Sequence, residues 1–346
     1  MKVQKTLVFV LILVVSLALA PSISSAQKQI VLRFAHYMQD NELLGAEHFL
    51  ADQVSKRTNG RVKIELYFGE TLGKGTELLG LLKDGALDMA TVCHGYYPSQ
   101  LPLWSATNSI PFLMKSGRTV MEVGRRIPNE IQGVKDEFLR WNVKFLNYVE
   151  PVLHYTMFSS KPVDRIEDMK GLKVRTYGLY LPQAMKAVGA VGVTMHPAET
   201  YEALKRGVID ASIWNMSGGY FMKNHEVAKH VIPWDIQSIC GYSHMMSLSV
   251  WKKLPADVQR VILAVEDDNR QYELDRMDAL DKEAAVKLKE EGAIFHPISA
   301  AERQRWVDAN PNFVEQWIEN CDKVGKGDEA RKMRDLWMQI IKEYDK

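Results

Sequence analysis

The sequence predicts an α/β fold of two similar domains, and three observations support this prediction. The chain has 346 residues, a length typical of two domains. A strand–helix–strand pattern stands near the start of the chain, and a helix–glycine–strand pattern occurs twice, far apart in the sequence. Both patterns are typical of sheets whose parallel strands are covered by helices.

The strand–helix–strand pattern lies between residues 30 and 68. Residues 30–35 (IVLRFA) form a short apolar run that predicts a buried strand. Residues 46–58 have the periodicity of an amphipathic helix, which Asn59-Gly60 ends because glycine adopts the left-handed conformation at low cost. Residues 62–68 then alternate apolar and polar side chains, as a half-buried strand does.

The repeated pattern occurs at residues 81–90 (LLKDGALDMA) and again at residues 203–212 (ALKRGVIDAS). Each copy predicts a helix end, a glycine cap and a strand that begins near the aspartate. We expect one copy in each domain. Ligands of open α/β sheets bind beyond the carboxyl ends of the strands, which here are residues 93–97 (CHGYY) and 214–217 (WNMS). Because both segments mix polar groups with aromatic rings, a cleft between the domains is the predicted binding site.

The N-terminus has the three parts of a secretory signal. Lys2 and Lys5 are positive, residues 7–20 (LVFVLILVVSLALA) are apolar, and residues 24–26 are small. The apolar run falls short of the roughly 20 residues that span a membrane. We therefore predict cleavage after residue 26 and a periplasmic protein, rather than a membrane anchor.

Charge and cysteine content exclude several classes of protein. The formal net charge is +1, and loss of the two signal lysines leaves −1. A nearly neutral chain has no bulk attraction for nucleic acid or for an anionic membrane. Cys93, Cys240 and Cys321 are odd in number and widely spaced, which fits neither a disulfide framework nor a metal knuckle. The sequence leaves open whether two of these cysteines form one disulfide bond.

The sequence contains no catalytic signature such as a nucleophile elbow, a zinc-protease helix, a phosphate loop or a dinucleotide fingerprint. His36, His94 and His154 each lie at or near the end of a predicted strand. Three converging histidines would suit zinc. Hydrogen bonds to an anionic ligand are the simpler interpretation, and a structural role stays open for each. We expect no metal and no other cofactor.

Arg175 ends the alternating strand predicted for residues 172–175. Its planar guanidinium matches a carboxylate or sulfonate with two parallel hydrogen bonds. In a cleft it would fix the orientation of an organic anion, whereas on the surface it would form an ordinary salt bridge. The spacing alone leaves both interpretations open.

A family resemblance favours the first interpretation. Residues 166–175 (IEDMKGLKVR) closely resemble a strand motif of the DctP-type solute-binding proteins of TRAP (tripartite ATP-independent periplasmic) transporters. Residues 159–163 (SSKPV), residues 203–210 followed by Asn215, and residues 251–259 (WKKLPADVQ) resemble further segments of that family in consistent order. The resemblance covers essentially the whole chain after the signal.

The resemblance implies the two-domain periplasmic binding protein fold, in which each domain has a mixed sheet flanked by helices and a long helix spans both. It implies domains of discontinuous segments, here residues 27–152 with 241–280 and residues 153–240 with 281–346. It also implies that a hinge closes the domains on the ligand and that a membrane permease receives it. We expect a monomer.

The resemblance also assigns roles to residues of the site. The motif arginine, here Arg175, pairs with the ligand carboxylate, and Asn215 contacts the ligand. Several family members that bind sialic acid or dicarboxylates carry a second arginine where this chain has His154-Tyr155. We therefore expect a small monoanion: a carboxylate such as an aromatic, hydroxy or oxo acid, or a sulfonate. The other residues expected to shape the site are Trp214, His94, His36, Tyr155, His154, Tyr96 and Tyr37.

Two other functions stay open from the sequence. An exported enzyme acting on a small organic acid would need a base beside the arginine, and His94 with Tyr96 is the nearest pair. A ligand sensor would dock its closed form on a membrane receptor, which requires no special motif. Turnover of the bound ligand would reveal the enzyme.

Overall fold

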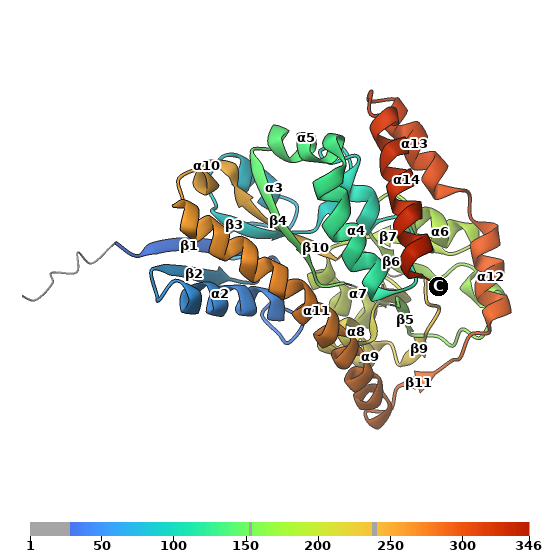
Figure 1. The fold of residues 1–346 in the computed structure, drawn as a ribbon. Helices are drawn as coiled ribbons and strands as arrows, with labels where there is room; N and C mark the ends of the chain where they lie inside the picture. The colour runs from blue at the N-terminus through green and yellow to red at the C-terminus, as the bar shows by residue number, and fades with distance from the viewer. Residues whose placement is uncertain (1–27, 152–153, 237–240, 346) are drawn as a thin grey trace, which may run out of the picture.

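Two sheets, one in each lobe of the molecule, organise the computed structural model (Figure 1). It describes residues 28–151, 154–236 and 241–345. The predicted signal and its cleavage point lie outside the described residues, as does Cys240. Within the described part of the chain, no helix combines the length and apolar character needed to cross a membrane.

The first sheet contains the predicted strand–helix–strand unit. Its strand order is β2-β1-β3-β10-β4, in which β1, β2 and β3 are parallel and β10 is antiparallel to both of its neighbours. Asn59 and Gly60, just after the first helix, both have positive φ, as the predicted helix stop requires. The bounds are β1 Ile30–Ala35, α2 Gly45–Arg57, β2 Val62–Tyr67, α3 Leu78–Lys83, β3 Met89–Val92, β4 Val143–Val149 and β10 Tyr242–Ser247.

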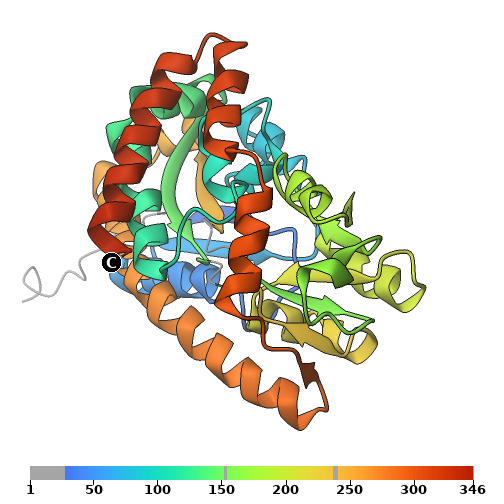
Figure 2. The ribbon, with the colours of Figure 1, turned by 90° about the vertical axis from the view of Figure 1, so that its right-hand side faces the viewer.

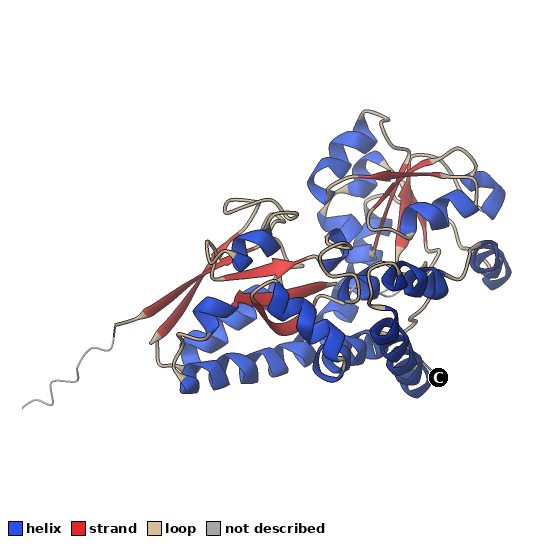
Figure 3. Ribbon diagram, turned by 90° about the horizontal axis from the view of Figure 1, so that it is seen from above, coloured by secondary structure: helices blue, strands red, loops and turns tan. Residues whose placement is uncertain are grey.

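The second sheet is also mixed. Its strand order is β11-β9-β5-β8-β6-β7, in which β6 is parallel to β7 and β8, whereas β5 is antiparallel to β8 and β9. Two mixed sheets flanked by helices confirm the predicted fold class (Figure 3). The bounds are β5 Thr156–Ser159, β6 Lys173–Thr176, β7 Val191–Thr194, β8 Ala211–Trp214, β9 His230–Ile232 and β11 Ile294–Phe295.

The internal repeat places equivalent segments in the two sheets. Helix α3 precedes β3 and helix α7 (Thr200–Lys205) precedes β8, each with an intervening glycine of positive φ. The aspartate of each copy accepts a hydrogen bond from the backbone of a parallel strand. Arg33 N donates to Asp88 at 2.8 Å, and Lys173 N donates to Asp210 at 2.9 Å. The repeat therefore sets the ends of β3 and β8 in the same way.

Helix α11 (Ala256–Glu290) has 35 residues and spans both lobes (Figure 1). It packs against α2 of the first lobe and against α8 of the second. Its buried face is apolar at Val258, Ile262 and Val265, polar at Glu266, Asn269 and Glu273, and apolar again from Met277 to Leu288. The predicted long helix is confirmed.

The last helices return to the first lobe. Helix α12 contacts the second lobe through the 3-10 helix at 166–169, whereas α14 packs against α4 and buries Met333, Trp337 and Ile340 (Figure 2). This packing differs from the expected grouping of residues 281–346 with the second sheet, since amphipathic periodicity does not say which lobe a helix covers. The remaining helices are α4 Gly117–Glu130, α5 Gln132–Arg140, α6 Leu181–Ala187, α8 Met216–Phe221, α9 Asn224–Val227, α10 Leu248–Trp251, α12 Ala300–Ala309, α13 Phe313–Asp322 and α14 Gly327–Tyr344, with 3-10 helices at His94–Tyr96, Trp104–Asn108, Ile166–Met169 and Pro197–Glu199.

Candidate ligand-binding site

The strand ends of the two lobes meet around a small cavity, which we call the inner cavity. Tyr37 follows β1 and Cys93 follows β3, while Arg175 and Trp214 end β6 and β8 on the opposite side. This placement agrees with the predicted cleft between the carboxyl ends of the strands. Its lining residues are Tyr37, Cys93, Tyr96, Asn108, Tyr155, Arg175, Tyr177, Trp214, Gly241 and Tyr242.

Arg175 is buried in this cavity with 1% of its surface exposed. Its Nε donates to the Met195 carbonyl at 3.3 Å, but Nη1 has no hydrogen-bond partner among the described residues. The guanidinium carbon lies 5.3 Å from the ring centroid of Tyr177 and 5.2 Å from that of Trp214. Within the described part of the chain it has no carboxylate partner. Because a buried cation is costly unless it is paired, an anionic group beside Arg175 would be favoured.

The other lining residues carry no charge near neutral pH. Burial raises the pKa of the Cys93 thiol to about 12, although the Arg175 guanidinium opposes this shift. Burial likewise raises the pKa values of Tyr37, Tyr155 and Tyr96. Arg175 is therefore the single fixed charge among the lining residues, and the cavity suits one negative charge. Cys93 and Cys321 are buried free thiols.

Hydrogen-bonding groups line the inner cavity together with the charged Arg175. The Tyr155 and Tyr177 hydroxyls lie 2.9 Å apart, and Tyr177 Oη donates to the Asn108 carbonyl at 3.2 Å, which connects the two lobes. Asn108 Nδ2 donates to the Gly241 carbonyl at 2.7 Å. The buried Tyr37 hydroxyl makes no hydrogen bond of good geometry among the described residues, although the Tyr242 and Tyr96 rings are its neighbours. It is thus available to a polar group of a ligand.

The inner cavity is nearly filled by its own side chains. Its volume is about 10 Å³, roughly the room that one water needs. A second cavity of about 300 Å³, which we call the outer cavity, adjoins it and shares Tyr96 and Tyr177. His196 Nε2 of the second lobe lies 3.4 Å from Glu70 Oε1 of the first at its rim. The outer cavity is lined by Thr76, Gly95, Tyr96, Pro98, Tyr177, Gly178, Leu179, Thr194, Met195 and His196.

Five of the nine predicted site residues line the inner cavity, and four do not. The five are Arg175, Tyr37, Tyr96, Tyr155 and Trp214. His94 lies in the core of the first lobe, where it stacks on Trp104 at 4.8 Å and makes 3.1 Å hydrogen bonds to Thr107 and Ser243. It is not beside Arg175, so the His94–Tyr96 pair of the enzyme alternative does not form in the cavity.

His154, Asn215 and His36 have partners of other kinds. The half-exposed His154 ring lies 2.7 Å from Asp235, and this hydrogen bond raises the pKa of His154. Asn215 donates to Asp281 of α11 at 2.8 Å, so it ties the end of β8 to the long helix. His36 stacks behind Tyr37 with ring centroids 5.0 Å apart. His36 and Asn215 support the cavity wall from behind.

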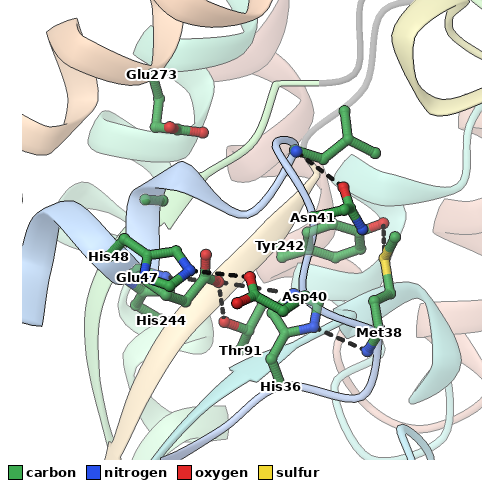
Figure 4. A network of polar contacts seen from close by, with 12 residues as sticks. His36, Met38, Asp40, Asn41, Glu47, His48, Thr91, Tyr242, His244 and Glu273 are labelled. Carbon is green, nitrogen blue, oxygen red and sulfur yellow. Dashed lines mark hydrogen bonds and ion pairs between the residues drawn. The ribbon is translucent and has the colours of Figure 1, made fainter. Parts of the chain in front are cut away.

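His36, Glu47 and Glu150 form the one described group with metal-like spacing. One atom from each lies within 4.8 Å of the others, and all three are buried. However, the Met38 backbone N–H donates to His36 Nδ1 at 2.9 Å (Figure 4). Because Nδ1 is an acceptor, the neutral ring keeps its proton on Nε2 and has no lone pair there for a metal. His36 is therefore a hydrogen-bond donor facing two carboxylates.

Glu47 belongs to a larger buried network (Figure 4). His244 lies 2.8 Å from Glu266 and 3.3 Å from Glu47. Burial alone would lower the pKa of His244, but the two carboxylates outweigh it and raise this pKa to about 10. Burial raises the pKa of Glu150 well above its usual value. The network holds β10 against α2 and α11 behind the cavity.

Several lining residues are not among those expected from the sequence. Tyr177 stands two positions after Arg175, so strand alternation already places both on one face. Asn108, Tyr242 and His196 carry no such signal, because they reach the two cavities from segments far away in the sequence. Only the folded chain brings them to Arg175.

Comparison with known proteins identifies the family. The model of the family "bacterial extracellular solute-binding protein, family 7" (DctP) matches residues 34–320. The C4-dicarboxylate-binding periplasmic protein DctP of Rhodobacter capsulatus is 26% identical over 303 residues, which are 85% of this chain and 88% of that protein. A monocarboxylate 2-oxoacid-binding periplasmic protein of Nostoc is 25% identical over 262 residues, which are 74% of this chain and 70% of that protein.

Solved structures agree with these relatives. A TRAP periplasmic solute-binding protein of Desulfovibrio salexigens with bound orotic acid superposes with a TM-score of 0.80 at 20% identity, covering 91% of this chain and 99% of that one. The fold, the strand-end cavity and the family match therefore lead to one conclusion. The chain belongs to family 7 of the bacterial extracellular solute-binding proteins, the DctP-type solute-binding proteins of TRAP transporters.

Proposed function

We propose that this protein is the exported solute-binding component of a TRAP transporter and that it captures a small organic monoanion between its lobes. The observation that carries the proposal is the buried Arg175, which has no carboxylate partner among the described residues. A carboxylate or sulfonate would supply two charge-assisted hydrogen bonds to its fork. The similar proteins named above bind organic acids, which supports the same class of ligand here.

The charge of the cavity argues for a single anionic group. Arg175 is the one cation among the lining residues, and His154, at the position where a second arginine stands in some family members, pairs with Asp235 instead. A second carboxylate would be desolvated among neutral tyrosines. No further cation among the lining residues would compensate for the free-energy cost of that desolvation. Tyr37 and Asn108 are polar groups suited to a hydroxyl or oxo substituent beside the bound carboxylate.

The proposal is tested by thermal-shift screening of the ligand-free protein against hydroxy, oxo, aromatic, dicarboxylic, sugar-acid and sulfonate anions. A ligand at about 100 times its dissociation constant stabilises the native state by about 2.7 kcal/mol. We expect the response among monoanions. Arg175→Ala removes the charge partner and should weaken binding by several kcal/mol. Arg206→Ala, at an exposed arginine paired with Glu202, is the matched control.

Two results would count against the proposal. The first is an unchanged response in Arg175→Ala, which would remove Arg175 from the site. The second is a consistently stronger response to dicarboxylates, which would require a second cation that the lining residues do not contain.

Export and delivery complete the proposed function. We expect the mature protein to begin at Gln27, which mass spectrometry of the periplasmic fraction would check. We expect uptake of the ligand by cells to depend on both this protein and its permease. Closure about a hinge would present the loaded form, as a monomer, to that permease.

A further inference from the structure

Two tyrosines separate the inner cavity from the outer cavity. Among the described residues, Tyr96 and Tyr177 are the ones that line both. Their ring centroids lie 6.4 Å apart with an interplanar angle of 85°. Tyr96 comes from the first lobe and Tyr177 from the second. Arg175 therefore lies on one side of this pair, and the larger cavity lies on the other.

A ligand can bind only if a side chain of the inner cavity moves or the lobes open. The inner cavity of about 10 Å³ is smaller than any carboxylic acid. Tyr177 is held by hydrogen bonds to Tyr155 and to the Asn108 carbonyl. Trp214 is held against Gly218 of α8. These residues cannot turn without losing buried contacts.

Tyr96 is the side chain that can move at the lowest cost. It is the one residue of the inner-cavity lining that is only partly buried. Its ring contacts are with other rings, namely Tyr37 at 5.9 Å and His196 at 6.0 Å. Because its edge already faces the outer cavity, rotation would exchange apolar contacts for similar ones. Such a rotation would join the two cavities into one elongated site.

The outer cavity is suited to an apolar group. Its walls include Pro98, Leu179, Met195 and the faces of the two tyrosines. Its titratable side chain, His196, already lies 3.4 Å from Glu70. At about 300 Å³ it has room for an aromatic ring, and burial of that ring would contribute affinity that a short acid lacks.

We infer that Tyr96 is the specificity-determining gate of this site and that the ligand is a monocarboxylate with an aromatic or extended apolar body. The carboxylate binds Arg175 in the inner cavity, and the body occupies the outer cavity beside the displaced Tyr96 ring. The inference rests on the proposed function, because it takes Arg175 as the anion site. It adds the shape and apolar character of the rest of the ligand.

Isothermal titration calorimetry with propionate and 3-phenylpropionate tests the inference, since these acids share a head group and differ by one phenyl ring. We expect wild-type protein to bind 3-phenylpropionate at least about 30-fold more tightly, as burial of a ring predicts. Thr194→Phe places a ring in the outer cavity from an exposed position on β7. This substitution should reduce the ratio of the two affinities, that for 3-phenylpropionate over that for propionate, about tenfold. Arg206→Ala, at an exposed arginine that lines neither cavity, is the matched control and should keep the ratio.

Other outcomes would overturn the inference. A wild-type ratio near one, or a ratio that Thr194→Phe leaves unchanged, would show that the outer cavity holds no part of the ligand. Binding of neither acid by wild-type protein that still binds another monoanion through Arg175 would have the same consequence. Failure of the proposed function looks different, because Arg175→Ala would then bind both acids as well as wild type. Urea unfolding midpoints establish that each variant is folded.

Discussion

Arg175 combines a cost to stability with its proposed role in binding. Its guanidinium is buried, and the rings of Tyr177 and Trp214 compensate for only part of the lost hydration. A buried charge without a partner lowers the stability of the ligand-free protein, and a bound carboxylate would supply the pair. The residue proposed to bind the anion is thus expected to lower the stability of the ligand-free protein.

Arg175→Met should separate these two effects. Methionine fills similar space without charge, so we expect the ligand-free variant to gain on the order of 1 kcal/mol in the free energy of unfolding. Ligand-induced stabilisation should disappear. Urea unfolding with and without ligand measures both quantities, and Arg206→Met at an exposed position is the control. A less stable empty variant would contradict this account.

His94 should make the protein sensitive to mild acid. Burial lowers its pKa to about 3, from about 6.5 in an unfolded chain. Below pH 6.5 the His94 ring is protonated in the unfolded chain but stays neutral in the folded protein. The free energy of unfolding therefore falls as the pH falls. This histidine accounts for a loss of about 2 kcal/mol between pH 7 and pH 5.

His94→Gln tests this pH dependence. The variant should lose stability at pH 7, because the hydrogen bonds to Thr107 and Ser243 change. Its stability should nevertheless decline less steeply than that of wild type between pH 7 and pH 5. Urea unfolding at several pH values gives the two slopes. Parallel slopes would mean that His94 titrates alike in the folded and unfolded chains.

At the level of elements, the turn from β8 into α8 positions the aromatic wall of the cavity. A side-chain carbon on Gly218 would lie 1.4 Å from the Trp214 ring, and one on Gly219 would lie 2.0 Å from the Phe158 ring. Both distances are impossible without movement of the rings. The two glycines therefore let α8 pack directly on Trp214, which in turn faces Arg175.

Gly218→Ala should displace the Trp214 ring and weaken ligand binding at least tenfold, as expected for a lost cavity wall. Near-ultraviolet circular dichroism and calorimetry follow the ring and the affinity. Gly80→Ala is the matched control, because no atom lies within 4 Å of its added carbon. In helix α3 it should stabilise the fold by about 0.5–1 kcal/mol. Unchanged affinity in Gly218→Ala would separate Trp214 from the site.

At the level of the whole molecule, contacts across the cavity hold the lobes together. The Tyr177 hydroxyl of the second lobe donates to the Asn108 carbonyl of the first, and the Phe112 amide donates to the Ile236 carbonyl at 2.9 Å. Helix α11 packs on both lobes and connects them along one side. If the lobes close on a ligand as proposed, we expect them to separate on the side opposite the helix.

Small-angle X-ray scattering should show a smaller radius of gyration when ligand is added to the wild-type protein. Tyr177→Phe removes the hydroxyl that bonds to Asn108 and should weaken the closed form by about 1 kcal/mol. The empty variant should therefore have a larger radius of gyration than empty wild type. Identical radii with and without ligand in both proteins would exclude closure on binding.

Much of the architecture could be predicted because it depends on local patterns. The strand at 30–35, the helix stop at Asn59-Gly60 and the two repeat copies follow from side-chain periodicity and from glycine conformation. Arg175 could be singled out because it lies near the end of a strand within a recognisable motif. The same approach misplaced His94, whose position after a strand says nothing about whether its ring points into the cavity or the core.

The sequence by itself determined the elements and their α/β arrangement, and it singled out Arg175 as the expected anion-binding residue, because strand alternation, helix periodicity and short motifs act over a few residues. Tertiary structure alone decided which distant residues complete the site: Asn108 and Tyr242 at the inner cavity, His196 at the outer one, and α14 on the first lobe. It also decided that Asn215 forms a hydrogen bond with α11 and that His154 forms one with Asp235. The physical reason is that burial and hydrogen-bond pairing depend on contacts between segments far apart in the sequence, which no local pattern specifies.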